Sequence, residues 1–279
     1  MAQAKDKPAK AAAQQRAREA ARAEAARLKS EAAARERRLR LIYIGAGVAL
    51  LVAVAVIVVL VLQSTTAKNY DEVDRPAGAN EYGAIALGQD MVPGGALTTA
   101  EDAVVVRIYA DYMCPGCATL EGRLGSKLTS LAEAGEIKLE ILVVSYLDRM
   151  ALGTQYSTRA ANAAATVAHY APEQYWAFHA KLFESDIQPG ENTEGLSDER
   201  LAEIAQQLGV PADVTDRFAA REFDSWVTFA TDQAKAQGVG GTPGLAIGKS
   251  GSDLTLAKLP GSIDLDAAIA RVRAGQSPD

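Results

Sequence analysis

The two cysteines of the chain are separated by two residues, in the segment Tyr109-Ala-Asp-Tyr-Met-Cys114-Pro-Gly-Cys117-Ala-Thr-Leu120. A pair at this spacing can be oxidised to a disulfide and reduced again, and the thiolate is the reactive form of a cysteine. A thiolate is stabilised where a helix begins, because the first turn presents free backbone N–H groups and the positive end of the helix dipole. The chemistry therefore depends on the elements that flank the pair.

The flanking residues place the cysteine pair where a strand leads into a helix. The β-branched run Val104-Val-Val-Arg-Ile-Tyr109 predicts a strand. Large apolar residues after the pair recur every three or four positions, which predicts a helix: Leu120, Leu124, Leu128 and Leu131. Pro115 suits the first position of that helix, where no N–H is needed. We expect a lowered pKa at Cys114 and a resolving role for Cys117, which lies one turn further on.

Three other interpretations of the pair remain open. A structural disulfide over so short a loop would remove little chain entropy, about 2 kcal/mol. A zinc half-site would need two further ligands, and the two histidines, His169 and His179, lie far down the chain. The pair could also be a coincidence without function. The strand-to-helix junction favours a redox pair over these three.

Charge is distributed unevenly along the 279 residues. The whole chain carries −6, but residues 1–40 contain 12 Lys/Arg against 5 Asp/Glu, which is +7 and leaves −13 for the remainder. Residues 1–40 contain almost no large apolar residue, so they predict a disordered or loosely helical tail. The acidic remainder argues against a nucleic-acid partner.

A long uncharged segment follows the basic tail. Leu41–Leu62 (LIYIGAGVALLVAVAVIVVLVL) has no charged residue and has the length of about 20 residues that crosses a bilayer. The flank Arg35-Glu-Arg-Arg-Leu-Arg40 is basic, so the positive-inside rule predicts a cytoplasmic N-terminus and an external segment 63–279. A cleavable signal peptide is the alternative, but its apolar region is usually about 7–15 residues long. We expect an uncleaved single-pass anchor at 41–62.

The remaining residues predict a linker and one α/β domain. Residues 63–80 are polar with Pro and Gly, which indicates a linker, and the domain then covers 81–279. The strand, the helix and a second strand over 137–144 predict a parallel pair with a right-handed crossover. Residues from about 150 to 237 indicate an inserted helical subdomain, with these expected helices: Thr154–Tyr170, Pro172–Ser185, Asp198–Leu208 after Ser197 as N-cap, and Pro211–Gln237. A hairpin and a final helix capped by Ser262 or Asp264 close the chain.

Three motifs in this order resemble the DsbA-like branch of the thioredoxin fold. They are Asp111-Tyr-Met-Cys114-Pro-Gly-Cys117, the aromatic block Tyr175-Trp-Ala-Phe-His-Ala-Lys-Leu-Phe183, and Gly238-Val-Gly-Gly-Thr242-Pro243. The resemblance covers roughly residues 81–275. It implies an α/β, thioredoxin-like fold with an inserted helical subdomain, here preceded by one transmembrane helix.

The resemblance also implies roles for individual residues. Cys114 and Cys117 would be the catalytic pair. Pro243 would be cis and would face that pair, which leaves the backbone of Thr242 free to bind a substrate strand. A cis X-Pro bond usually marks a functional turn, whereas without the resemblance a trans proline at an edge strand would be the simpler interpretation. Supporting positions are Pro115, Gly116 and Asp111, and neither a metal ion nor a cofactor is expected.

The chain departs from the family's pattern at two places. Thioredoxin-like enzymes often keep a buried acid six residues before the first cysteine, where this chain has Ile108. Cys117 would then lose its proton through water or Asp111, or the reductive half-reaction would be slow. The two residues between the cysteines are Pro and Gly, without a histidine to stabilise a thiolate. We therefore expect a reduction potential less oxidising than about −120 mV.

The implied function is that of a membrane-tethered, extracytoplasmic thiol–disulfide oxidoreductase in a bacterial cell membrane. It would introduce disulfides into exported cysteine-containing proteins, and a membrane reoxidase of the quinone-linked type would restore the pair. The lipid bilayer would be a further partner through residues 41–62. The alternatives are a disulfide reductase or isomerase, for example in cytochrome c maturation, and a non-enzymatic binding domain in which Cys114→Ser changes nothing.

Overall fold

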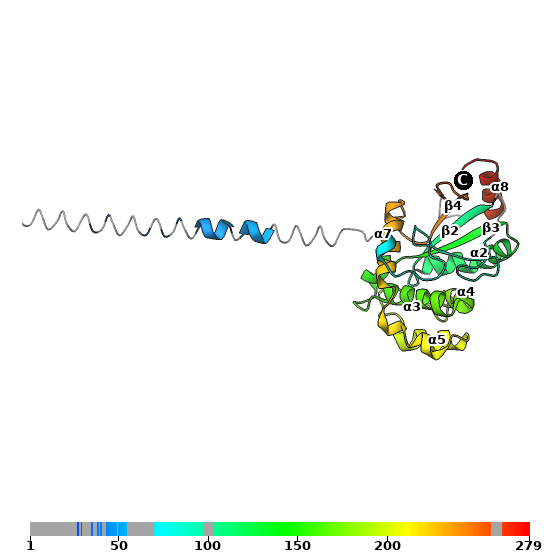
Figure 1. Cartoon of the computed structure of the whole chain (residues 1–279), viewed down its shortest axis with the longest axis horizontal. Helices are drawn as coiled ribbons and strands as arrows, with labels where there is room; N and C mark the ends of the chain where they lie inside the picture. The colour runs from blue at the N-terminus through cyan, green and yellow to red at the C-terminus, as the bar shows by residue number, and fades with distance from the viewer. Residues whose placement is uncertain are drawn as a thin grey trace, which may run out of the picture. The chain divides into compact units, whose positions relative to one another are not determined.

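The computed structural model of the chain describes residues 27, 29, 35, 38, 40, 43–48, 50–54, 70–97, 103–257 and 264–279. Two compact units are separated, Met1–Thr66 and Ala67–Asp279, and the labelled elements of Figure 1 belong to the second.

Only parts of the expected anchor and tail fall among the described residues. Within 41–62, residues 43–48 and 50–54 are described and helical, with exposed large apolar side chains. The rest of that segment, most of the tail 1–40 and residues 63–69 lie outside the described residues. No helix within the described ranges combines the length and the apolar character that a bilayer crossing needs. The predicted transmembrane helix therefore stays a prediction.

A five-stranded mixed sheet with the order β1-β3-β2-β4-β5 forms one layer of the second unit. Its strands are β1 (Ile85–Ala86), β2 (Val104–Ala110), β3 (Ile137–Val143), β4 (Gly244–Lys249) and β5 (Thr255–Leu256). The central strand β2 pairs in parallel with β3 and antiparallel with β4. All seven residues of β2 are buried, and all but Arg107, which pairs with Glu140, are apolar or aromatic, as expected for a strand covered on both faces. The predicted strand and the parallel crossover are both confirmed.

Helix α2 (Pro115–Glu133) makes the crossover from β2 to β3. Cys114 is its N-cap, with an extended backbone, and Pro115 occupies the first helical position as predicted. The buried side chains of α2 include Leu120, Leu124, Leu128 and Leu131. At the other end Gly135 has a φ of +72°, a left-handed conformation that glycine adopts without steric cost. The helix thereby ends in a turn that leads directly into β3.

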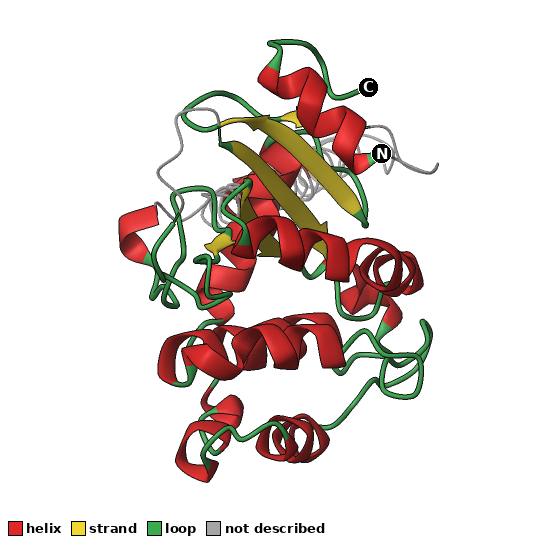
Figure 2. Ribbon diagram, turned by 90° about the vertical axis from the view of Figure 1, so that its right-hand side faces the viewer, coloured by secondary structure: helices red, strands yellow, loops and turns green. Residues whose placement is uncertain are grey.

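Between β3 and β4 the chain builds a helical subdomain, as the sequence predicts. Its members are η2 (Tyr146–Met150), α3 (Tyr156–Tyr170), α4 (Pro172–Lys181), α5 (Asp198–Gln207), α6 (Ala212–Thr215), η3 (Phe218–Ala220) and α7 (Asp224–Ala236). In Figure 1, α3, α4 and α5 lie below the sheet while α7 lies beside it, and Figure 2 shows helices below the sheet layer from another side. The predicted cap is confirmed, because the Ser197 hydroxyl accepts a hydrogen bond from the N–H of Arg200. The last helix, α8 (Leu265–Arg273), is capped by Asp264.

One expected helix is wrong in its length. Residues 211–237 form three short elements, α6, η3 and α7, and not one helix. The buried side chain of Asn162 on α3 lies at the interruption, where it donates to the carbonyl of Phe218 and accepts from the N–H of Phe223. Arg221 between them has a φ of +56°. The side-chain amide thus replaces the hydrogen bonds that a continuous helix would have made.

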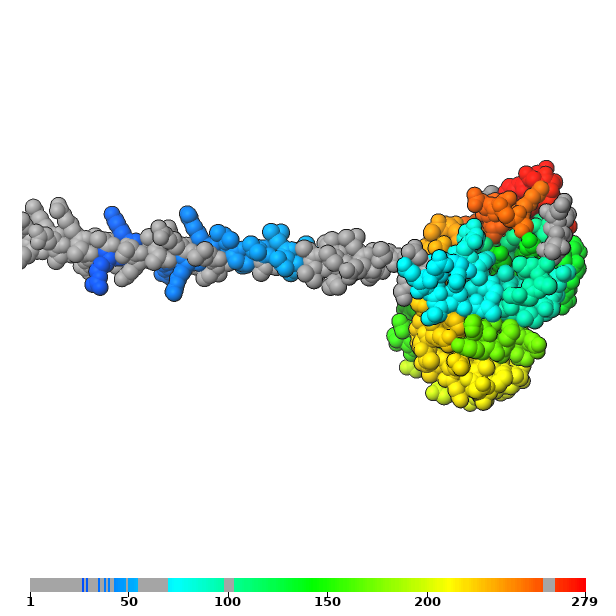
Figure 3. Space-filling view, in the orientation of Figure 1, coloured from blue at the N-terminus to red at the C-terminus, as the bar shows by residue number. Residues whose placement is uncertain are grey.

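The segment 70–80 also differs from its predicted role as a linker. It contains η1 (Tyr70–Glu72), and the Tyr70 ring lies 6.0 Å from the Phe229 ring of α7, between centroids. The Tyr70 hydroxyl donates to the carbonyl of Ala79, and Ala79 forms an isolated bridge with Ile85 of β1. In Figure 3 this cyan segment spreads over the near surface of the second unit. The folded part therefore begins about ten residues earlier than composition indicates.

Candidate active site

Cys114 and Cys117 lie at the start of α2, directly after the central strand β2. Both are free thiols, and they are only 6% and 3% exposed. The residues on the open side of this turn are Pro115, which is exposed, and Gly116, which is half-buried. The structure thus places the two sulfurs at the helix N-terminus, where the sequence predicts them.

The loop before β4 lies against the cysteines, although it is more than 120 residues away in the chain. The Thr242–Pro243 peptide bond is cis, as the family resemblance implies. The thiol of Cys114 donates to the carbonyl of Thr242 at 3.4 Å. A β-carbon at Gly116 would lie 2.9 Å from Cδ of Pro243, so only glycine allows this close approach. The pairing of β4 with β2 brings the loop to this position.

The surroundings of the two sulfurs separate their acidities. Hydrogen bonds lower the pKa of Cys114 to about 6 despite its burial. The largest effect comes from the Cys117 thiol, and smaller ones come from the Thr242 hydroxyl and from the N–H groups of Cys117 and Gly116. Burial, and then the neighbouring Cys114, raise the pKa of Cys117 far above its ordinary value. At neutral pH Cys114 is therefore the thiolate and Cys117 the protonated partner that donates to it.

Asp111 is fully buried and ties the active-site turn to the helical subdomain. Its carboxylate accepts hydrogen bonds from the N–H of Met113 at 2.9 Å, the N–H of Leu147 at 2.9 Å and the hydroxyl of Ser157 at 2.7 Å. Burial raises the pKa of Asp111 to about 6, and the charge of Cys114 contributes in the same direction. These bonds indicate a positioning residue. The group of Asp111 that bonds to the Cys117 sulfur is the backbone N–H.

Some contacts of the site were not predicted from the sequence. The side-chain amide of Gln188 donates to the carbonyls of Tyr112 and Cys114, at 3.2 and 3.0 Å. Gln188 comes from the loop after α4, and no motif or periodicity distinguishes it in the sequence. Ser157, the second residue of α3, was likewise missed because its partner Asp111 lies 46 residues away.

Both histidines lie away from the sulfurs. His179 is buried against the ring of Tyr112, whose hydroxyl lies 2.9 Å from His179 Nδ1, and burial lowers the pKa of His179 to about 3. It is therefore a neutral core residue at physiological pH. His169 contacts the Phe223 ring instead. Across the described ranges, no group of three or more His, Cys, Asp or Glu residues is arranged to hold a metal ion.

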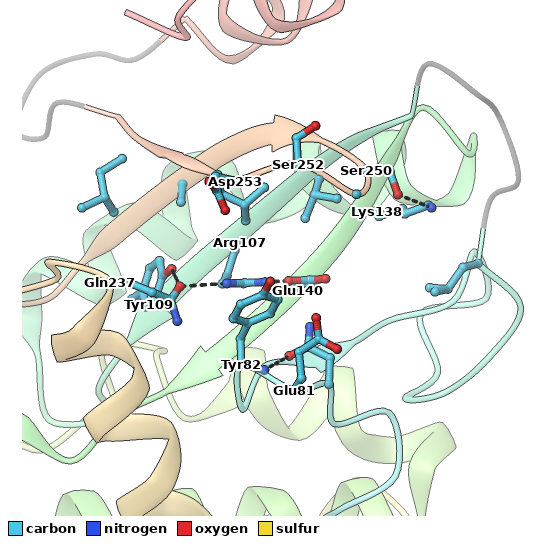
Figure 4. Close-up of a pocket in the computed structure, with 17 residues that line it drawn as sticks. Glu81, Tyr82, Arg107, Tyr109, Lys138, Glu140, Gln237, Ser250, Ser252 and Asp253 are labelled. Carbon is cyan, nitrogen blue, oxygen red and sulfur yellow. Dashed lines mark hydrogen bonds and ion pairs between the residues drawn. The ribbon is translucent and has the colours of Figure 1, made fainter. Parts of the chain in front are cut away.

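A cavity of about 770 Å³ contains neither cysteine in its lining. It lies over the sheet face formed by alternate residues of β2, β3 and β4 (Figure 4). Arg107 forms its floor, paired with Glu140 at 2.7 Å and bonded to the amide oxygen of Gln237 at 2.9 Å. Tyr82 covers the guanidinium at 4.5 Å. Arg107, Glu140 and the amide oxygen of Gln237 thus satisfy one another, while the side-chain NH₂ of Gln237 has no partner among the described residues.

Comparison with known proteins gives a consistent family. Residues 93–264 match the family model described as thioredoxin. The crystal structure of oxidised DsbA from Mycobacterium tuberculosis shares 30% identity, with a TM-score of 0.55, and the match covers 68% of this chain and 92% of that one. Disulfide bond formation protein D of Bacillus subtilis is 25% identical over 160 residues, 56% of this chain and 68% of that protein.

A third relative is much longer than this chain. The serine/threonine-protein kinase PknE of Mycobacterium tuberculosis is 30% identical over 106 residues, which are 37% of this chain but only 19% of the kinase. The chain therefore spans about a fifth of the length of this curated relative.

Proposed function

The chain belongs to the thioredoxin family, among the DsbA-like thiol–disulfide oxidoreductases, and on that basis we propose that it introduces disulfide bonds into exported proteins. The observation that carries the proposal is the acidity difference between the two sulfurs. A Cys114 thiolate with a pKa near 6 is a good leaving group, because a low pKa of the leaving thiol speeds its departure in disulfide exchange.

The proposed reaction begins with the Cys114–Cys117 disulfide. A substrate thiolate attacks the sulfur of Cys114, the Cys114–Cys117 bond breaks, and Cys117 leaves and takes up a proton. The second substrate thiolate then attacks the substrate sulfur of this mixed disulfide. A substrate disulfide forms and Cys114 leaves as a thiolate, so two electrons have passed from the substrate to the chain. A membrane reoxidase of the quinone-linked type then removes these two electrons from the pair.

The residues around Cys114 fit this sequence of steps. Burial shields both sulfurs, and Pro115, Gly116 and Thr242 line the approach to Cys114. The carbonyl of Thr242 accepts from Cys114, which places this backbone beside the position where a substrate sulfur would attach. We propose that Thr242 and Pro243 bind the substrate chain next to its reacting cysteine.

The location we propose is the outer face of a cell membrane, with residues 41–62 as the anchor. The support comes from the uncharged length of that segment and from its basic N-terminal flank. Disulfides persist outside the cytoplasm, so the location and the chemistry are mutually consistent.

Trapping in cells tests the function directly. The full-length Cys117→Ala variant cannot resolve a mixed disulfide from within, so it should accumulate covalent adducts of Cys114 with exported cysteine-containing proteins. The double variant Cys114→Ser/Cys117→Ala is the matched control and should show none. Equal amounts of adduct from both variants, or failure of the full-length wild type to oxidise a reduced test protein, would contradict the proposal.

The same adducts decide between oxidation and its alternatives. A reductase for haem attachment would be trapped mainly on apocytochromes c, whereas a general oxidase would be trapped on many exported proteins. A non-enzymatic binding domain would give no adduct at all.

A further inference from the structure

We propose that a groove between α2 and α4 receives a lysine or arginine side chain of the substrate polypeptide, held by Glu121 and Trp176. This inference rests on the proposed function and adds a preference among its substrates.

The groove continues from the reactive sulfur along the active-site helix. Its volume is about 580 Å³, and it extends from Ala118, the residue after Cys117, to Thr129. Cys114, Ala118 and Glu121 follow one another at spacings of four and three, so they share a face of the helix. The groove is hollow because the α2 residues that line it are mostly small: Ala118, Thr119, Gly122, Gly125, Ser126 and Thr129.

Glu121 brings an unpaired carboxyl group into this groove, and a neighbouring cation would favour its ionised form. It is partly buried, and within the described ranges no hydrogen bond or ion pair is formed by its carboxylate. Burial raises the pKa of Glu121 to about 7, the direction expected for a carboxylate without a partner. The other acid in the lining, Glu184, already pairs with Lys181 at 2.5 Å. No lysine or arginine lines the groove itself.

The opposite wall supplies an aromatic surface for a cation. Trp176 and Phe183 line the groove from α4 and the turn after it, and Trp176 is only partly buried. An ammonium or guanidinium over an aromatic face gains a cation–π interaction, and indole is the best of the aromatic rings for it. A basic side chain in the groove would therefore pair with the carboxylate of Glu121 and also contact the indole ring of Trp176.

The spacing predicts where in the substrate this side chain lies. Seven helical residues separate Cys114 from Glu121, which at 1.5 Å per residue is about 10 Å. An extended chain rises by roughly 3.3 Å per residue. The basic residue is therefore expected about three positions from the cysteine that attacks Cys114.

A peptide series measures this preference. Reduced dithiol peptides, identical except for Arg, Ala or Glu three positions from the first cysteine, are mixed with the oxidised full-length chain, and the rate of reduction of the Cys114–Cys117 disulfide is followed. The Arg peptide should react about fivefold faster than the Ala peptide, the size of one partly buried ion pair, and the Glu peptide more slowly still.

Two variants tie the preference to the carboxylate. Glu121→Gln should remove the Arg preference, while Glu133→Gln, the same charge change elsewhere on α2, should keep it. A β-carbon at Gly125 would overlap Oε1 of Glu121, so Gly125→Ala should displace the carboxylate and weaken the preference. In the Glu121→Gln background the same Gly125→Ala change should have no further effect.

The outcomes separate the groove from the proposed function. Equal rates for the Arg, Ala and Glu peptides, or an Arg preference that survives Glu121→Gln, would contradict the proposed site for a basic side chain. Either result would leave the proposed oxidase function unaffected. If no peptide is oxidised, the proposed function fails, and the groove is then tested by calorimetry on the same peptides with serine for cysteine. Tighter binding of the Arg peptide that is lost in Glu121→Gln supports the groove, and equal binding overturns it.

Discussion

The chemistry of Cys114 depends on groups that converge from separate parts of the chain. The Cys117 thiol and the N–H of Gly116 come from the same turn, while Thr242 comes from the loop before β4. These contacts favour the thiolate, with the Thr242 hydroxyl as the contributing group, whereas the hydrogen bond from the Cys114 thiol to the carbonyl of Thr242 favours the protonated form. The nearby carboxylate of Asp111 acts in the opposite direction. The pKa of Cys114 therefore reflects a balance between hydrogen bonds that lower it and one buried negative charge that raises it.

This balance makes the stability of the reduced chain depend on pH. The pKa of Cys114 is about 6 in the folded chain and near 8.5 in the unfolded chain. The contribution of the Cys114 thiolate to the free energy of unfolding is therefore complete above about pH 8.5 and is lost as the pH falls through about 6. The free energy of unfolding of the reduced chain should therefore rise between pH 6 and roughly 8.5 relative to Cys114→Ser. Denaturant unfolding of both proteins across this range measures it, and parallel pH profiles would contradict the assignment.

Asp111→Asn should change both stability and acidity. The asparagine side chain keeps one acceptor oxygen but turns an NH₂ group toward donors, so we expect a loss of about 2–3 kcal/mol in the free energy of unfolding. Loss of the negative charge should lower the pKa of Cys114 further, which a thiolate absorbance titration would detect. Ser157→Ala is the control, because it removes one hydrogen bond of Asp111 and keeps the charge. An unchanged pKa in Asp111→Asn would exclude the proposed coupling.

At the scale of elements, the helical subdomain holds the active-site turn from one side and the β4 loop closes it from the other. Gln188 of the subdomain fixes the carbonyls of Tyr112 and Cys114. Within the subdomain, α3 is the element on which the others pack, and its buried Asn162 joins it to the interrupted segment before α7. The position of α7 in turn sets where the chain enters β4.

Asn162→Ala should therefore destabilise the domain more than its size indicates. Two buried backbone groups, the carbonyl of Phe218 and the N–H of Phe223, would lose their partner, at a cost of about 2–4 kcal/mol. Thr166→Val is a matched control on the same helix, because the Thr166 hydroxyl bonds only to the carbonyl of Asn162 and should cost less than about 1 kcal/mol. Equal losses for the two variants in urea unfolding would show that the side-chain amide does not hold the interruption.

At the scale of the whole molecule, the proposed arrangement is a cytoplasmic basic tail, an anchor at 41–62 and an external acidic domain. The second unit begins at Ala67, and packing of η1 against α7 starts almost at once, at Tyr70. About seven residues then separate the end of the predicted anchor from the folded domain.

Thiol labelling of intact cells tests this arrangement. A maleimide that cannot cross membranes should label Cys114 of the full-length Cys117→Ser variant in cells kept reduced, without permeabilisation. The double variant Cys114→Ser/Cys117→Ser should give no signal. The chain should also stay with the membrane fraction in alkaline carbonate and be released by detergent. Labelling that requires permeabilisation, or release by carbonate, would refute the proposed topology.

Local sequence determined much of this protein. The strand that starts at Val104, the recurrence of leucines from Leu120 to Leu131, Pro115 at the first helical position and the cap at Ser197 each depend on neighbours within a few positions. Strands and helices near the cysteines were therefore predicted almost to the residue. The pair itself was identified for the same reason, since the N-terminus of a helix acts on residues adjacent to it.

Only the tertiary structure decided the features that join distant residues. Nothing local indicates that Asn162 interrupts residues 211–237, that residues 70–80 pack on α7, or that Gln188 and Ser157 support the active-site turn. The unpaired carboxylate of Glu121 opposite Trp176 is also visible only after α4 has packed beside α2. Sequence periodicity records which face of an element is buried, whereas the partner of a polar group depends on which elements folding brings together, and that is determined by the packing of the whole domain.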